Sequence, residues 1–401
     1  TKIMPSSSLP SLGGMATFNM QHGFVEALIR GFRSGFLPDE SYHHLSQCET
    51  LEDMKLNLQE TDYGQSIQND ASITPPLLEQ RSLQKMVTEF FYLRAQAVEP
   101  LATFLDYITY EYMIENIMLL LRGTISGRSA NELLVQCHPL GIFNESTMRQ
   151  IPGFDASPRG YSDLYETVLV DTPVGVYFQR YIDTQSKTKV SVASDVRGVL
   201  EEVQLEILKH SIMKLYMEDF YAFCMSLGGE TAEVMGGLLR ARADRIAINI
   251  TLNSFNTPLN EPVMRDNYRK NLYPSFGDMY PEGTELLQRA DDEGKLAAAL
   301  QSFAIYRPLA ERIGHSGTSH EEFNVDDEFY RHEVRLYELA FESQMHFGCF
   351  YAYVKLKEQE IRNLVWISEC ILQRRKDQIG NYIPIFSKSD SRSSGNKSGH
   401  Q

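Results

Sequence analysis

The feature that most constrains the fold is a helical spacing of apolar side chains that recurs along the chain. The last fifth shows it best, because residues there recur at i, i+3, i+4, i+7 and i+11, which is one face of an α-helix. They are Ile361, Leu364, Val365, Ser368 and Leu372. Runs that alternate like β-strands between hairpin turns are nearly absent. We therefore predict an all-α fold.

The same spacing predicts a series of helices, separated where proline, glycine and small polar residues cluster. The predicted helices cover roughly residues 20–35, 50–59, 79–121, 128–136, 163–181, 195–226, 231–253, 284–304, 326–346 and 349–378.

The last predicted helix carries the residues that we single out as coupling or structural candidates. Glu358 and Arg362 are one turn apart, in the acid-first order that favours an ion pair. Trp366, the only tryptophan, is expected in the core, with a partner contact as the alternative. Cys370 lies one turn further on and is expected to be a structural thiol, with a redox role as the exception.

A short pattern suggests that the chain contains an internal repeat. Three predicted helices carry an acid, then Asn five residues later, then Ile or Leu. The pairs are Glu111 with Asn116, Asp244 with Asn249, and Glu358 with Asn363. Either these acids are solvated or in first turns, or they are buried and paired with arginines of other helices, such as Arg245 or Arg362.

These spacings lead to a prediction of the domain organisation. One helical domain over residues 17–387 would contain three pseudo-repeats, roughly 17–160, 161–270 and 271–387. An N-terminal extension (1–16) and a C-terminal tail (388–401), both rich in Ser and Gly, are expected to be disordered.

Composition limits the partners that the chain can bind. It has 38 Lys and Arg against 53 Asp and Glu, a net charge of −15. That balance disfavours nucleic acid and anionic membrane surfaces, which attract basic patches. The apolar runs are far shorter than the roughly 20 residues of a membrane span, so we expect a cytosolic protein that meets membranes only through partners. The five cysteines form no CxxC pair and are expected to be reduced.

No motif predicts catalysis, a cofactor or a metal. The phosphate-binding pattern GxxxxGK[ST] is missing, as are DDxxD and GxSxG motifs. Only Glu40 and His43 have the ExxH spacing of a di-iron bundle, and we interpret that acid as part of a helix N-terminus. We expect no catalytic, cofactor-binding or metal-binding residues, although a triad assembled in space cannot be read from sequence.

The amino-acid sequences of many segments resemble those of the subunit d family of V-type proton ATPases. The resemblance covers nearly the whole chain, and its matching segments occur in the same order as in the family, which is stronger evidence than any single motif. It is carried by GFVEALIRGFRSGFL (23–37), QCETLEDMKLNLQETDYG (47–64), VEPLATFLDYITYEYMIENIMLLLRGT (98–124), CHPLGIF (137–143), LVDTPVGVYF (169–178), LYMEDFYAFCMSLGGETAEVM (215–235), ADRIAINITLNSF (243–255), MYPEG (279–283), LQRADD (287–292) and LKEQEIRNLVWISECILQRRKDQIGNYIPIF (356–386). Residues 1–16, 144–160, 181–199 and 388–401 depart from it.

The resemblance implies a fold and a role. The family has an all-helical funnel with pseudo-threefold symmetry, and its members catalyse nothing themselves. The expected partners are the proteolipid c-ring, the central stalk subunits D and F, and subunit a, on the cytosolic face of vacuolar, endosomal or other acidified membranes. The protein would couple ATP-driven rotation to proton transport. The alternative is a helical scaffold or adaptor outside the pump; a helical enzyme is disfavoured by the missing motifs.

Overall fold

The computed structural model describes residues 14–126, 128–151, 166, 169–170, 172–187, 197–314 and 324–386. Every regular element in these residues is a helix, so the prediction of an all-α fold is confirmed. The predicted tail (388–401), nearly all of the predicted extension (1–16) and about half of each divergent segment, 144–160 and 181–199, lie outside the described residues. Within the described part, no helix is both long and apolar enough to cross a membrane.

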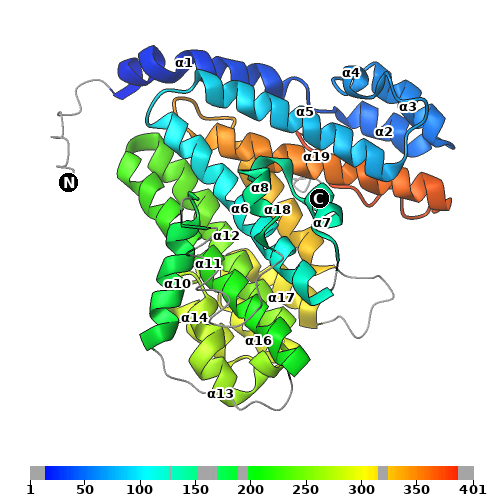
Figure 1. Cartoon of the computed structure of the whole chain (residues 1–401). Coiled ribbons are helices and arrows are strands. Elements are labelled where there is room, and N and C mark those ends of the chain that lie inside the picture. The colour runs from blue at the N-terminus through cyan, green and yellow to red at the C-terminus, as the bar shows by residue number, and fades with distance from the viewer. Residues whose placement is uncertain are drawn as a thin grey trace, which may run out of the picture.

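The helices form an upper layer and a body that descends from it (Figure 1). The layer holds α1 (Gly14–Arg33), α5 (Pro75–Gln96) and α19 (Gly348–Gln373), with α2 (Asp39–Gln47), α3 (Leu51–Gln59) and α4 (Gly64–Ile67) at one end. The descending helices are α6 (Leu101–Ser126), α10 (Gly175–Lys187), α11 (Arg197–Leu227), α12 (Gly229–Ser254) and α18 (Val325–Leu339).

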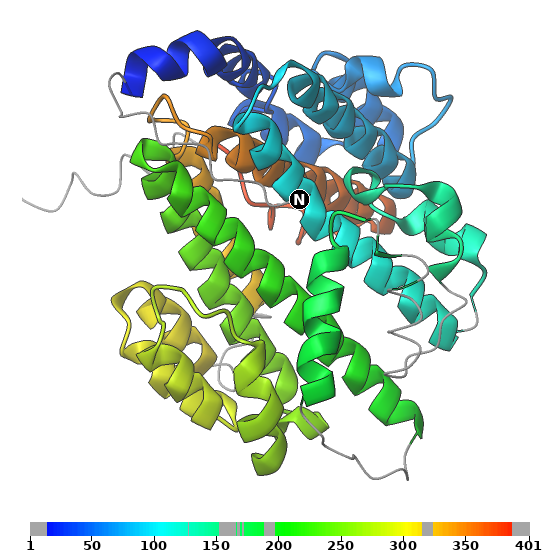
Figure 2. The ribbon, with the colours of Figure 1, turned by 60° about the vertical axis from the view of Figure 1, so that its left-hand side comes forward.

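Shorter helices complete the structure. Beside α6 lie α7 (Ala130–Gln136) and α8 (Glu145–Met148). The lower end, seen from a second side in Figure 2, holds α13 (Pro262–Met264), α14 (Lys270–Leu272), α15 (Glu282–Arg289), α16 (Glu293–Gln301) and α17 (Arg307–Gly314).

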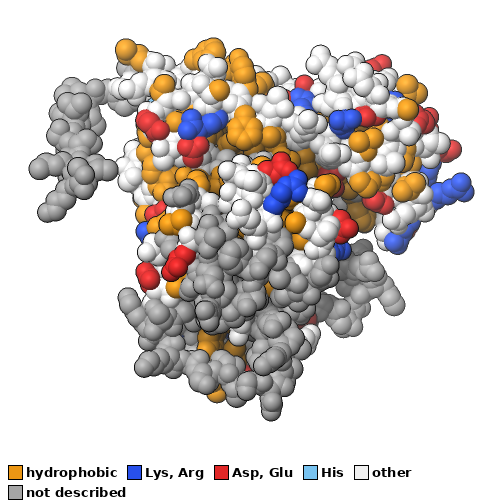
Figure 3. Space-filling view, in the orientation of Figure 1, with side chains coloured by type: hydrophobic (Ala, Val, Ile, Leu, Met, Phe, Trp, Pro, Cys, Tyr) orange, Lys and Arg blue, Asp and Glu red, His pale blue; other side chains and the backbone are white. Residues whose placement is uncertain are grey.

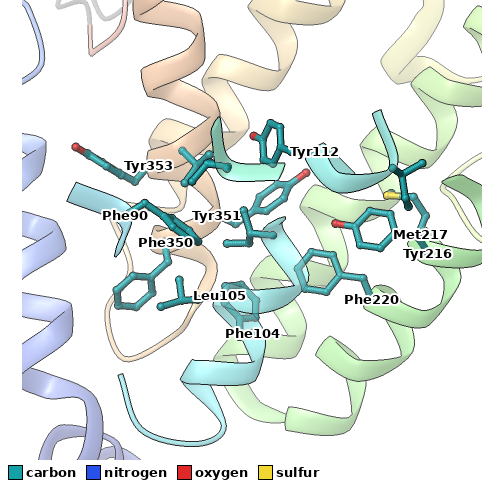
Figure 4. Packing of buried hydrophobic residues seen from close by; sticks show 14 of the residues in the cluster. Phe90, Phe104, Leu105, Tyr112, Tyr216, Met217, Phe220, Phe350, Tyr351 and Tyr353 are labelled. Carbon is teal, nitrogen blue, oxygen red and sulfur yellow. The ribbon is translucent and has the colours of Figure 1, made fainter. Parts of the chain in front are cut away.

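Three hydrophobic cores hold the molecule together, and two long helices join them. The central core packs aromatic side chains of α5, α6, α11 and α19, including Phe90, Phe104, Phe220 and Tyr351 (Figure 4). The lower core surrounds the second half of α12, and the end core surrounds the second half of α19. Because α12 and α19 each take part in two cores, a movement of one core relative to the central one must disturb close packing.

Helix α19 is buried on nearly all sides, even where it carries charge. Glu360 is 0 % exposed, and its carboxylate accepts hydrogen bonds from the backbone N–H of Leu37 at 2.7 Å and the hydroxyl of Tyr63 at 2.6 Å. Lys357, one turn earlier, lies 2.8 Å from the same carboxylate. Buried charges persist in proteins when they are paired and hydrogen-bonded in this way.

Several predicted boundaries were wrong, and the causes are local. The segment predicted as one helix over 79–121 is two helices, because Pro100 has no N–H to donate and the chain turns at residues 97–100. The segment 284–304 divides into α15 and α16, because Asp292 caps the second by accepting the backbone N–H of Lys295 at 2.7 Å.

Other differences concern helix ends and short helices. Helix α18 ends at Leu339 instead of residue 346, and α19 ends at Gln373 instead of residue 378. Arg374 takes a left-handed conformation with φ of 58° and stops α19. The short helices α2 and α17 were not predicted, although Glu40 does lie in the first turn of α2, as expected. Of the segment predicted as a helix over 163–181, the structure describes residues 166, 169–170 and 172–181, and α10 begins only at Gly175.

Candidate functional site

The candidate site is a charge-lined cavity of about 450 Å³ between α6, α11, α12, α18 and α19. Its acidic and basic lining residues are Glu111, Glu115, Lys209, His210, Arg242, Arg245, Glu333, Lys355, Glu358 and Arg362. Acids and bases come from helices far apart in the sequence, so the cavity depends on the tertiary fold rather than on any local motif.

Lys355 of α19 is the centre of the first charge cluster. Its ammonium nitrogen lies 3.2 Å from a carboxylate oxygen of Glu111 on α6 and 3.2 Å from one of Glu358 on its own helix. Arg242 of α12 forms a further ion pair with Glu111. Burial alone would raise the pKa of Glu111, but the positive charges of Arg242 and Lys355 outweigh it and lower that pKa.

Glu358 belongs to the same cluster. Its carboxylate accepts a hydrogen bond from the hydroxyl of Tyr112 at 2.6 Å, and its side chain is only 17 % exposed. Burial opposes ionisation, but the charge of Lys355, and after it that of Arg362, lowers the pKa of Glu358 to about 2. Glu358 is therefore ionised at every physiological pH.

A second cluster forms the opposite wall. Arg245 of α12 lies 2.7 Å from Glu333 and 3.2 Å from Asp326, both on α18. The guanidinium carbons of Arg245 and Arg362 lie 4.3 Å and 4.2 Å from the ring centroid of Tyr330. Such cation–π contacts fix the direction of both arginines without neutralising them.

Some polar atoms of the cavity have no partner within the described residues. One carboxylate oxygen of Glu333, a residue 6 % exposed, accepts no hydrogen bond, and the Nε of Arg242 donates none. Glu115 is exposed within the cavity but lies close to the surrounding protein. Burial, and next the charge of Glu111, raises its pKa to about 7. Because the unpartnered atoms of Glu333 and Arg242 are themselves buried, they do not face the cavity, and the exposed acid in its lining is Glu115.

The predicted ion pair between Glu358 and Arg362 does not form, and that prediction was wrong. Arg362 instead donates to the side-chain oxygen of Gln359 at 2.8 Å and 3.1 Å, while Glu358 turns toward Lys355. The interpretation of the repeated acids as buried, paired groups holds for Glu111 and Glu358, with other cations than those we named. The other interpretation, that these acids are solvated or lie in the first turn of a helix, does not hold for either residue.

The third repeated acid lies outside the cavity. Asp244 is 1 % exposed and accepts the backbone N–H groups of Asp278 at 3.2 Å and Met279 at 3.1 Å, and the hydroxyl of Tyr306 at 2.9 Å. Burial, partly offset by these hydrogen bonds, raises its pKa to about 6. It fixes the loop before α15 instead of pairing with an arginine.

Two of the three repeated asparagines make the same contact, which we call the asparagine clasp. The side-chain amide of Asn116 accepts a hydrogen bond from the backbone N–H of His138 at 2.7 Å and donates one to the backbone carbonyl of the same residue at 2.9 Å. Asn363 does the same to Ile383, at 3.1 Å and 2.6 Å. Both clasped residues precede a proline. Asn249 instead donates to Asp326 at 3.3 Å, so the threefold repeat stays a prediction.

Trp366 and Cys370 lie away from the cavity. Trp366 is 38 % exposed and donates its indole N–H to the carbonyl of Gln378 at 3.1 Å, so the prediction that it is buried was wrong. It lines a neighbouring groove of about 1120 Å³, which shares Tyr330 and Arg362 with the cavity. Cys370 is 4 % exposed, and burial raises the pKa of its thiol, as in a structural cysteine. All five cysteines are free and buried.

Sequence reasoning missed several residues of the cavity, above all Tyr112, Arg242 and Lys355. Lys355 lies one turn before Glu358, at i and i+3, so helical spacing could have identified it. Nothing local marks Arg242, whose partner Glu111 is on another helix. No cluster of three His, Cys, Asp or Glu that could hold a metal occurs in the part of the chain that the structure describes.

Fold and site together define a class of protein. They describe an all-helical protein whose long helices are joined by interhelical ion pairs around a polar cavity. The family described as "ATP synthase (C/AC39) subunit" matches residues 25–382.

Curated relatives give the same result. The chain is 41% identical over 375 residues to "V-type proton ATPase subunit d" of Dictyostelium discoideum, covering 93% of this chain and 98% of that one. It is 38% identical over 372 residues to the subunit d of Saccharomyces cerevisiae, covering 92% and 99%. The chain therefore belongs to the subunit d family of V-type proton ATPases, and it is a non-catalytic subunit of such a pump.

Proposed function

We propose that the protein links the central stalk of the pump to its proteolipid ring, and so couples ATP-driven rotation to proton transport at an acidified membrane. The observation that carries the proposal is the charged cavity, whose opposing walls come from α6, α12, α18 and α19. A torque-bearing joint must not yield, and ion pairs between helices that share close-packed cores resist shear. The family membership gives the proposal its context.

In this proposal the cavity receives the lower end of the stalk, formed by subunits D and F. Its charged lining, in which Glu115 and Arg362 are exposed, favours a polar polypeptide end over an apolar ligand. Subunit a of the membrane sector would be a further neighbour. Partners alone would hold the chain at the membrane.

The experiment uses the affinity-tagged full chain in vesicles that acidify. We expect it to copurify with proteolipid and with both stalk subunits. Glu115→Arg reverses a charge inside the cavity and should reduce the recovered stalk subunits while the proteolipid is retained. Glu132→Arg on α7, an exposed acid outside the cavity, is the matched control and should behave like the wild type.

Two results would contradict the proposal. If the wild-type chain brings down no proteolipid, the alternative of a scaffold outside the pump takes its place. If Glu115→Arg, with an unchanged melting temperature, retains the stalk fully, the cavity is not the stalk site. Parallel rates of ATP hydrolysis and proton pumping on the same vesicles test coupling, since a weakened joint should lower pumping more than hydrolysis.

A further inference from the structure

The outer face of α1 and of the second half of α5 carries no charge, although 23% of the chain's residues are charged. From Thr17 to Ser34, and again from Gln84 to Val98, every residue classed as exposed is uncharged. We call these exposed residues the uncharged face. Its large members are strongly exposed: Met20 is 88% exposed, Phe24 64%, Phe91 48% and Tyr92 49%. Hydrophobic side chains gather along this upper edge of the molecule (Figure 3).

The charges of α1 all turn inward. Glu26, 6% exposed, pairs with Arg30 at 2.7 Å, and Arg30 also donates to the carbonyl oxygen of Phe341 at 2.9 Å. Arg33 lies over the ring of Phe386, 4.2 Å from its centroid. A solvent-exposed helix normally has the opposite arrangement, with its charges outward. The polarity of α1 therefore fits a helix covered on both sides.

Small residues recur along the outer side of α1. Gly23, Ala27 and Gly31 follow one another at four-residue spacing beside Met20 and Phe24. A Cβ added to Gly31 would meet no atom within 4 Å, and one added to Gly23 would meet only the side chain of Asn19, at 3.4 Å or more. Neither glycine is needed by the packing of this chain, yet glycine weakens a helix. Small residues at this spacing allow another helix to approach closely.

We propose that the uncharged face binds the apolar side of an α-helix from a membrane-sector subunit of the pump. This inference rests on the proposed function. Charge decides between occupants: an anionic lipid surface would require lysines or arginines, which the face lacks. Arg94, at its border, is already paired with Asp106 at 2.6 Å. A charged partner surface would bury unpaired groups, at considerable cost.

The test places a charge on the face in the full chain, within the assembled pump. Phe24→Asp should lower the amount of chain retained by the purified membrane sector by about tenfold or more, because a buried unpaired carboxylate is costly. Leu56→Asp on α3 is the matched control, since Leu56 is 62% exposed and outside the face. It should assemble normally. Both isolated variants should melt like the wild type.

A second variant and a crosslink make the outcome specific. Gly31→Leu should leave the isolated chain at least as stable, since nothing crowds the position, yet should impair assembly. A photo-crosslinking residue at position 24 should capture a membrane-sector subunit.

Three results would overturn the inference while the proposed function stands: normal assembly of both variants, a crosslink to a second copy of this chain, or a crosslink to lipid alone. If the wild-type chain recovers no membrane-sector subunit, the proposed function fails first, and this inference fails with it.

Discussion

Lys355 is the residue on which the charge balance of the cavity depends. It is 7% exposed and touches two carboxylates, those of Glu111 and Glu358, as well as the hydroxyl of Tyr112 at 2.9 Å. Removing one partner of such a buried cluster leaves the others uncompensated, which costs more than the pair contributes. Substitutions with little change of volume are therefore not neutral here.

We predict that Glu358→Gln lowers the free energy of unfolding by roughly 2–3 kcal/mol at pH 7, because Lys355 loses one of its two carboxylates. The folded-state pKa of Glu358, about 2, lies below its ordinary value of 4.5, so its contribution is complete above pH 4.5 and is lost as pH falls toward 2. Urea unfolding should show a smaller difference from the wild type at pH 3.5 than at pH 7.

The control for this prediction lies on the same helix. Glu369→Gln changes an acid on the exposed side of α19 that accepts a hydrogen bond from the side-chain amide of Gln373 at 3.1 Å. It should alter stability by less than about 0.5 kcal/mol at either pH. Equal effects of the two substitutions would show that the Lys355 cluster contributes nothing beyond an ordinary surface acid.

Glu115 should behave in the opposite way. Its folded-state pKa, about 7, lies above 4.5, so ionisation of the folded protein is unfavourable and the resulting loss of stability grows as pH rises from 4.5 to above 7. Glu115→Gln should therefore raise the melting temperature at pH 8 more than at pH 5. Because the side chain reaches water in the cavity, we expect a modest effect. A decrease at pH 8 would mean that the carboxylate has a stabilising partner.

At the scale of elements, the sequence identified the helices well but not how they end or meet. Long segments with a clear apolar spacing, such as 231–253, matched α12 within a few residues. The break at Pro100 was overlooked because the apolar pattern continues through it. Trp366 was misplaced because apolar type alone does not say which side of α19 faces solvent, and Ile367 beside it takes the buried position.

Interhelical pairing is the part that sequence could not supply. Glu111 was recognised as a repeated acid, but its partners Arg242 and Lys355 lie more than a hundred residues away. The asparagine clasp was partly visible, since the repeat named Asn116 and Asn363. Their contact residues were not, because no spacing rule links a helical asparagine to a loop some 20 residues further on.

The asparagine clasp yields a prediction at this scale. Asn363→Ala and Asn116→Ala should each lower stability by roughly 2–3 kcal/mol, because each leaves a backbone N–H and carbonyl without their partner. Asn249→Ala removes a single 3.3 Å contact with Asp326 and should cost less than about 1 kcal/mol. Urea unfolding of the three variants compares them directly. Equal losses at all three positions would contradict a special role for the clasp.

At the scale of the whole molecule, the irregular segment after α19 packs against the upper layer and stabilises it. Phe386 packs against Phe36 and Phe341, with ring centroids 5.6 Å and 5.8 Å apart, and Arg33 lies over its ring. These contacts join Arg33 of α1, and the segments just after α1 and α18, to the end of the described chain. The residues that follow are rich in Ser, Lys and Gly and contain no large apolar side chain.

We therefore expect a sharp boundary at Phe386. Deleting residues 387–401 should leave the unfolding transition and pump assembly unchanged, whereas Phe386→Ala in the full chain should cost roughly 1–3 kcal/mol through lost aromatic and cation–π contacts. Chemical unfolding of both proteins measures their stability, and recovery of proteolipid with the tagged chain measures pump assembly. Loss of assembly in the truncated protein, with normal unfolding, would show that the tail is a docking element rather than a dispensable extension. Normal stability of Phe386→Ala would mean that Phe36, Phe341 and Arg33 hold the layer together without it.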